Sequence, residues 1–132
     1  MVIDDDEPTN FLSNMIIEEA ACTRHIQIED SVAKAISYLR NSAKPGCGNN
    51  DQPVPDLIFL DINMPAMNGW EFLEKFERLK NKLKKNIELY VMTSSVRESD
   101  KERSTRYACV SSFISKPLSK QMLNSICSQG FA

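Results

Sequence analysis

The chain has 132 residues, of which 42% are hydrophobic and 26% charged, an ordinary composition for one globular domain. The formal net charge is −2, so the composition gives no electrostatic footprint for nucleic acid. No apolar run reaches the roughly 20 residues of a membrane span and the N-terminal segment is acidic, so we expect a cytoplasmic protein that does not enter a membrane.

The four cysteines are widely scattered along the chain: Cys22, Cys47, Cys109 and Cys127. They lack the close pairs of a zinc site and are too sparse for a disulfide framework. We expect reduced thiols that mostly fill the core.

The first part of the chain alternates strand and helix patterns. A short strand ends at Val2-Ile3, and helical spacing of apolar residues follows over 8–21. Polar and apolar residues alternate over 25–29, which predicts a strand near the edge of the sheet. A second helix begins at Val32, behind Asp30 or Ser31 as its N-cap.

The middle of the chain contains the strongest strand signals. Residues 43–55 are dense in glycine, proline and asparagine, which predicts an exposed loop. Residues 57–60 and 89–92 are continuous apolar runs of strand length, the pattern of strands covered on both faces. Between them, residues 70–83 have helical spacing with charges on the opposite side.

The last part of the chain is weaker in pattern. Residues 95–106 are rich in charge, so a helix there would pack marginally. Residues 113–114 predict a short fifth strand, and a last helix begins near Ser119. Strict alternation of strands and helices favours a parallel sheet covered on both faces. We predict an α/β, doubly wound, flavodoxin-like fold: a five-stranded parallel sheet of order 2-1-3-4-5 with five helices, in one domain over residues 1–132.

Acidic residues follow two strands that this order makes neighbours. Asp4, Asp5 and Asp6 follow the first strand, and Asp61 follows the third. Two carboxylates about 4 Å apart repel by about 4 kcal/mol at an effective dielectric near 20, so a convergent cluster is explained best by a bound hard cation such as Mg²⁺. The alternative is helix capping alone, which the first three aspartates by themselves would favour.

Polar residues also follow the fourth and fifth strands, where Thr93 and Lys116 stand. A hydroxyl and an ammonium are suitable donors to phosphate oxygens. Singly, such a threonine is more often a turn or cap residue and such a lysine is more often solvated. Their position at the same edge as the aspartates favours a functional site.

These motifs, in this order and spacing, resemble a known family. The sequence is similar to response-regulator receiver domains, including the chemotaxis receiver protein, over essentially the whole chain. The segments that carry the resemblance are Val2 to Asp6, Leu60 to Pro65, Asn68-Gly69, Met92 to Ser94 and Phe113 to Pro117. The resemblance implies a phosphoacceptor in a two-component phosphorelay, with Mg²⁺ as cofactor.

The resemblance also implies a role for each matching residue. Asp61 would become the aspartyl phosphate; Asp4, Asp5, Asp61 and the backbone carbonyl of Asn63 would hold Mg²⁺, with Asp6 as a helix cap. Thr93 would swing toward the phosphoryl group, Lys116 would pair with it, and Phe113 would rotate inward as the aromatic switch residue. Gly69 would be structural, and Pro117 could follow a cis bond.

The resemblance further implies partners. A sensor or hybrid histidine kinase or a phosphotransfer protein would donate the phosphoryl group, and a downstream protein would bind the face of the fourth helix, fifth strand and fifth helix. The polar fourth helix could equally be only a solvated surface. No output domain is expected, nor any enzymatic activity beyond autocatalysed phosphorylation and dephosphorylation.

Two other functions fit the sequence less well. An aspartate-nucleophile phosphatase would need an acid/base aspartate two residues after Asp61, where this chain has Asn63. A pseudo-receiver would keep the fold and bind partners without phosphorylation, but Asp61, Thr93 and Lys116 are all present. Phosphorylation with Mg²⁺ and a small phosphodonor distinguishes these three functions.

Overall fold

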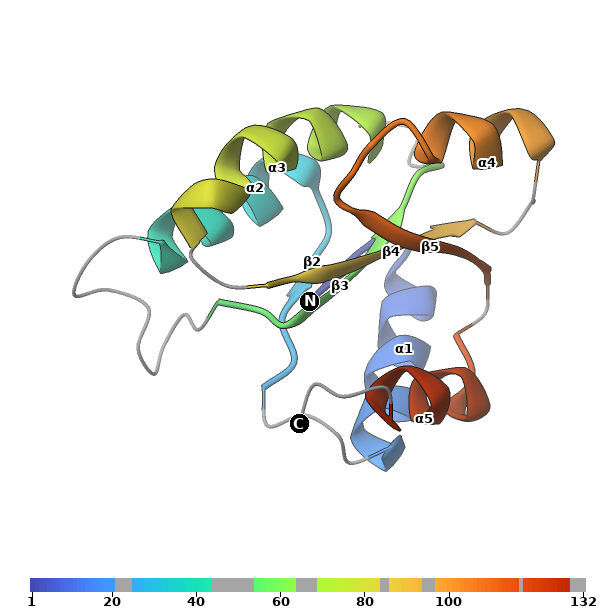
Figure 1. Ribbon diagram of the computed structural model, residues 1–132. Helices are drawn as coiled ribbons and strands as arrows, with labels where there is room; N and C mark the ends of the chain where they lie inside the picture. Colours follow the sequence, from blue (N-terminus) through green and yellow to red (C-terminus); the bar gives the residue numbers. More distant parts are fainter. Residues whose placement is uncertain are drawn as a thin grey trace.

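The computed structural model describes residues 1–20, 25–43, 54–63, 69–83, 86–93, 97–116 and 118–128. Strands and helices alternate along the chain (Figure 1). The strands are β1 (Val2–Ile3), β2 (Ile28–Glu29), β3 (Leu57–Asp61), β4 (Glu88–Thr93) and β5 (Val110–Ser115). The helices are α1 (Glu7–Ala20), α2 (Val32–Ser42), α3 (Gly69–Leu83), α4 (Glu98–Ser104) and α5 (Lys120–Ser128).

The five strands form one sheet of order β2-β1-β3-β4-β5, and every neighbouring pair is parallel. The predicted doubly wound fold is therefore confirmed. In the register of the central strands, Val2 lies beside Phe59 and Asp61 lies beside Met92. The carboxyl ends of β1, β3 and β4 thus meet at one edge of the sheet.

Helices cover both faces of the sheet. Figure 1 shows α2 and α3 on one face and α1 and α5 on the other. Each face has its own apolar cluster: Leu39, Leu60 and Phe72 belong to the first, and Phe59 and Leu123 to the second. Because β3 contributes to both clusters, its uninterrupted apolar sequence is explained by burial on two sides.

Local capping places two helix starts where the sequence predicts them. Ser31 is the N-cap of α2, and its side chain accepts a hydrogen bond from the Lys34 backbone at 3.2 Å. Ser119 accepts from the Met122 backbone at 3.1 Å and so caps α5. Each cap satisfies a backbone donor that the first helical turn leaves without a partner.

Two strands differ in length from the prediction. β5 covers Val110–Ser115 rather than residues 113–114, because pairing with β4 extends it over serines that carry no apolar signal. β2 covers only Ile28–Glu29 rather than residues 25–29, because it pairs with the two-residue β1 alone. Its predicted place at the edge is correct.

Helix α4 is held to the protein by few buried groups, as its charge-rich sequence predicts. Ser104 is its one buried residue. The guanidinium carbon of Arg103 lies 4.4 Å from the ring centroid of Trp70 in α3, and Tyr107 stacks on the same ring at 6.0 Å. A cation–π contact and a ring stack therefore replace an apolar stripe in holding this helix.

The cysteines only partly match the expectation. Cys109 is free and buried, whereas Cys127 is disulfide-bonded, so the prediction of a reduced thiol is wrong for Cys127. Linear spacing carries no information on which cysteines the fold brings together, and the partner of Cys127 lies outside the described residues. The predicted loop lies outside them over residues 44–53, as does Pro117. No described helix is both long and apolar enough to cross a bilayer.

Candidate phosphoryl and metal site

Three aspartates converge at the carboxyl edge of the sheet. Asp4 and Asp5 follow β1 and Asp61 ends β3, and one carboxylate oxygen from each lies within 4.8 Å of the others. Asp4 and Asp61 are buried while Asp5 is exposed. The site is thus open on one side and formed by strand ends on the other.

Lys116 brings a cation into this cluster from the residue after β5. Its Nζ atom donates to Asp4 Oδ2 at 2.5 Å and to Asp61 Oδ2 at 3.1 Å. Its own backbone N–H donates to the Thr93 carbonyl at 2.8 Å, which anchors the end of β5 to β4. Residues more than a hundred positions apart in the sequence therefore share one ionic cluster.

The electrostatics of the cluster are those of a binding site. Burial raises the pKa of Asp4; the hydrogen bonds from Lys116 and from the Asp6 backbone oppose the rise, and the charge of Asp61 adds to it. Burial works to lower the pKa of Lys116, but its bonds and attraction to Asp4 and Asp61 outweigh burial and raise it. Lys116 is therefore charged at neutral pH and offsets part of the carboxylate repulsion.

Asp6 stands apart from the cluster and caps α1. It accepts hydrogen bonds from the backbone N–H and the hydroxyl of Thr9, and these bonds lower the pKa of Asp6. Asp4 is supported by a residue that the sequence did not indicate: buried Asn10 donates from Nδ2 to the Asp4 carbonyl at 2.7 Å. The sequence carries no signal for this contact, because Asp4 lies before the helix and six positions from Asn10.

The hydroxyl of Thr93 lies beside the aspartates at the end of β4. Thr93 is fully buried, and Asn63 Nδ2 donates to its Oγ1 at 2.6 Å. The Asn63 backbone N–H also donates to Asp61 Oδ1 at 2.9 Å. The sequence predicts a binding role only for the carbonyl of Asn63 and not for its side chain, because the path of the chain after β3 decides where that side chain points.

Phe113 is placed away from the carboxylates. It lies in β5 beside Val91 and packs, partly buried, against the apolar cluster under α2 and α3. Phe113 precedes by two positions Ser115, the residue that pairs with Thr93. The predicted site residues that the structure brings together are Asp4, Asp5, Asp61, Asn63, Thr93 and Lys116.

Gly69 is the first residue of α3 and packs directly on the strand that ends in Asp61. A Cβ atom at this position would lie 2.7 Å from the Ile62 Cα and 2.9 Å from the Asp61 carbonyl oxygen. Both neighbours are backbone atoms, which move only with the strand itself. The close approach accounts for a glycine here.

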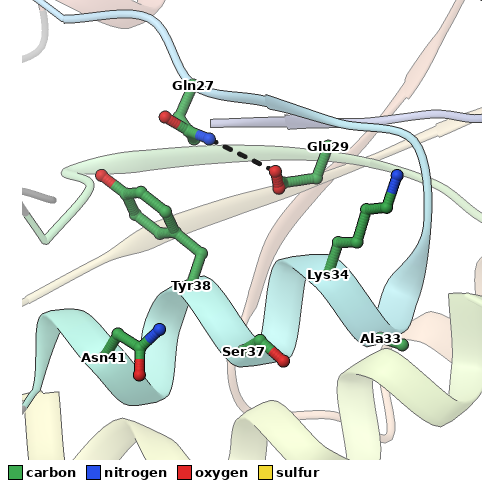
Figure 2. A pocket seen from close by; sticks show the side chains of 7 residues that line it. All are labelled: Gln27, Glu29, Ala33, Lys34, Ser37, Tyr38 and Asn41. Atoms are coloured by element: carbon green, nitrogen blue, oxygen red, sulfur yellow. Dashed lines mark hydrogen bonds between the residues drawn. The ribbon is translucent and has the colours of Figure 1, made fainter.

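A separate hollow of about 390 Å³ lies between β2 and α2 (Figure 2). Among the polar side chains that line it, Gln27 donates to Glu29 at 3.3 Å, and Lys34 pairs with Asp30 at 3.0 Å. The Tyr38 ring extends from α2 toward the segment that carries Gln27. None of the three converging aspartates lines this hollow, so it is separate from the acidic cluster.

The donor set of the acidic cluster fits a hard divalent cation. Carboxylate oxygens on one open side suit Mg²⁺, which keeps several waters and binds few protein ligands. The lysine and threonine beside them would contact anionic oxygens of a further ligand. Such a combination suits phosphoryl chemistry.

Comparison with known proteins identifies the family. Residues 1–128 match the family described as the response regulator receiver domain. The chain belongs to this family. A two-component response regulator from Cytophaga hutchinsonii has a similar structure, with a TM-score of 0.82 and 30% sequence identity over 97% of this chain and 92% of that one. The receiver domain is thus a component of two-component signalling.

Curated relatives of this receiver domain are larger proteins. A hybrid signal transduction histidine kinase from Dictyostelium discoideum is 32% identical over 78% of this chain, which corresponds to 6% of that protein. The sensor histidine kinase CheAY of Helicobacter pylori is 34% identical over 58% of this chain and 9% of its own length. Receiver domains pair with histidine kinases or phosphotransfer proteins.

Proposed function

We propose that Asp61 of this receiver domain accepts a phosphoryl group from a phosphohistidine of a histidine kinase or phosphotransfer protein. The observation that supports this proposal is the convergence of Asp4, Asp5 and Lys116 on Asp61. A carboxylate oxygen of Asp61 would attack phosphorus, the phosphorus–nitrogen bond would break, and the imidazole would leave with its bonding electron pair.

Each neighbouring residue has a defined part in this proposal. Asp4 and Asp5, with Asp61 and the Asn63 carbonyl, would hold Mg²⁺, and the bound ion would neutralise charge on the phosphoryl oxygens. The Lys116 ammonium, already 3.1 Å from Asp61 Oδ2, would pair with a phosphoryl oxygen. Asp4 is itself fully buried.

Phosphorylation would bias a two-state equilibrium of the surface. Thr93 would move toward the phosphoryl group, and Phe113 would occupy the space that it leaves. Helix α4 is the element most easily repacked, since Ser104 is its one buried residue. We propose the face of α4, β5 and α5 as the surface that a downstream protein reads.

The phosphodonor protein is proposed to dock on α1. Phe11, Leu12 and Met15 are large apolar residues that are exposed on this helix, and Phe11 is 70% exposed. The helix begins directly after the aspartates, so this patch lies on the helix that leads away from the site. Phe11→Ser should slow transfer from a phosphohistidine protein that phosphorylates the wild type, while transfer from a small phosphodonor stays unchanged.

Mass spectrometry tests the central proposal. After incubation with Mg²⁺ and a small phosphodonor such as acetyl phosphate, the protein should gain one phosphoryl group that is stable in acid and labile in base. Asp61→Asn should abolish the gain, and Asp56→Asn, an exposed aspartate at the entry of the same strand, should not. Turnover of the donor without a modified protein would indicate a phosphatase, and neither result would indicate a pseudo-receiver.

A further inference from the structure

The side chain of Asn63 connects the two groups that the proposed switch must move relative to each other. Its backbone N–H donates to Asp61 Oδ1 at 2.9 Å, and its Nδ2 donates to Thr93 Oγ1 at 2.6 Å. One residue thus contacts both the proposed phosphoryl acceptor and the hydroxyl proposed to approach the phosphoryl group.

The backbone of Thr93 is fixed in place. It ends β4, lies beside Ser115 of β5, and its carbonyl accepts the Lys116 backbone N–H at 2.8 Å. The residue is fully buried. Because the backbone is held, the hydroxyl can travel only by rotation about χ1, and a threonine moves between a few discrete staggered rotamers.

Such a rotation changes the contact with Asn63. The amide nitrogen of Asn63 can only donate, so it holds an acceptor lone pair of the Thr93 oxygen. The backbone of Asn63 is held by its own bond to the Asp61 carboxylate, so it does not move with the hydroxyl. A jump of Thr93 to another rotamer therefore breaks the 2.6 Å bond.

We propose that Asn63 is a positioning residue whose amide holds Thr93 in its resting rotamer and opposes the switch. This inference rests on the proposed function, and it concerns the side chain of Asn63, whereas the metal site uses its carbonyl. Losing one neutral hydrogen bond in the resting state alone corresponds to about a fivefold shift of the equilibrium toward the switched state.

The test measures the affinity for beryllofluoride, a stable mimic of the phosphoryl group, in the presence of Mg²⁺ by fluorine NMR. Asn63→Ala should bind the mimic about fivefold more tightly than the wild type, because binding no longer has to break the hydrogen bond between Asn63 and Thr93. The affinity for Mg²⁺ alone is measured for both proteins, and the mimic is titrated at a Mg²⁺ concentration that saturates each of them. Asn124→Ala, an exposed asparagine on α5, is the matched control and should bind as the wild type does.

A double-mutant cycle shows whether the effect passes through Thr93. In a Thr93→Val background, Asn63→Ala should change neither the affinity for the mimic nor the urea midpoint. Urea unfolding without Mg²⁺ or mimic should show a coupling between the two positions in the wild-type background. If the effects of the two substitutions simply add, Asn63 does not act through Thr93 and the inference is wrong.

The outcomes separate this inference from the function on which it rests. If the wild type binds the mimic and Asn63→Ala binds it equally or more weakly, the proposed role of the Asn63 amide is wrong and the proposed function stands. If the wild type binds no beryllofluoride with Mg²⁺, the proposed function fails, and the proposed role of the Asn63 amide fails with it.

Discussion

Replacing Lys116 with methionine removes the cation that lies between Asp4 and Asp61. The Nζ atom lies 2.5 Å from one carboxylate and 3.1 Å from the other, and the carboxylate oxygens of the cluster lie within 4.8 Å of one another. Two unit charges at that separation repel by about 3.5 kcal/mol at an effective dielectric near 20. Removing one partner of a buried ion pair costs about 3–5 kcal/mol, and because the lysine side chain is 15% exposed we expect the lower value.

Lys116→Met should therefore lose about 3 kcal/mol of unfolding free energy without Mg²⁺. With Mg²⁺ the deficit should shrink, because a cation bound by the same carboxylates supplies the missing positive charge. The assay is urea unfolding of the wild type, Lys116→Met and the charge-preserving control Lys116→Arg, each with and without Mg²⁺. Wild-type stability of Lys116→Met in metal-free buffer, or a deficit that Mg²⁺ leaves unchanged, would refute this reasoning.

The pH dependence of the same variant has a defined sign. Burial already raises the pKa of Asp4, and loss of the Lys116 hydrogen bond would raise it further. A carboxyl group whose pKa is higher in the folded than in the unfolded protein contributes less stability as the pH rises between the two values. The deficit of Lys116→Met should thus be largest at neutral pH and shrink toward about pH 4, the ordinary carboxyl range. A deficit that grows on acidification would contradict the assignment.

Three further predictions concern packing and burial rather than ion pairing. Gly69→Ala should lower the free energy of unfolding by about 1–3 kcal/mol, because its Cβ would lie 2.7 Å from the Ile62 backbone. In urea unfolding, the midpoint should fall while the slope stays unchanged. Arg103→Ala should alter the fluorescence of Trp70, the one tryptophan, and cost about 0.5–1 kcal/mol, with Arg103→Lys retaining part of both; an unchanged spectrum would disprove the contact. Burial raises the pKa of Cys109 to about 12, so iodoacetamide should alkylate this thiol in urea but not in the folded protein at about pH 8, as mass spectrometry of the peptides would show.

The sequence was most informative where burial alone decides structure. β3 and β4 are buried on both faces, so their apolar runs predicted them without knowledge of their neighbours. β5 was predicted too short because Ser111 and Ser112 become strand residues through pairing with β4, and pairing between distant segments leaves no local signal.

The candidate site followed the same rule. The strand order predicted that Asp4, Asp5 and Asp61 would converge with Lys116, since a residue that directly follows a strand has little freedom of position. Contacts that depend on a side chain reaching across the site were missed, as with the amide of Asn63. The disulfide of Cys127 was missed because it depends on three-dimensional proximity alone.

The two borders of the sheet are unequal, and this affects how the domain behaves at high concentration. β2 is only two residues long and offers little template for another chain, whereas β5 is six residues long and forms the opposite border. The outward serines of β5 are polar, which weakens cohesion between copies that meet there. Any filament or swapped dimer of this domain should therefore grow from the β5 border, and a lysine at Ser112 should suppress it.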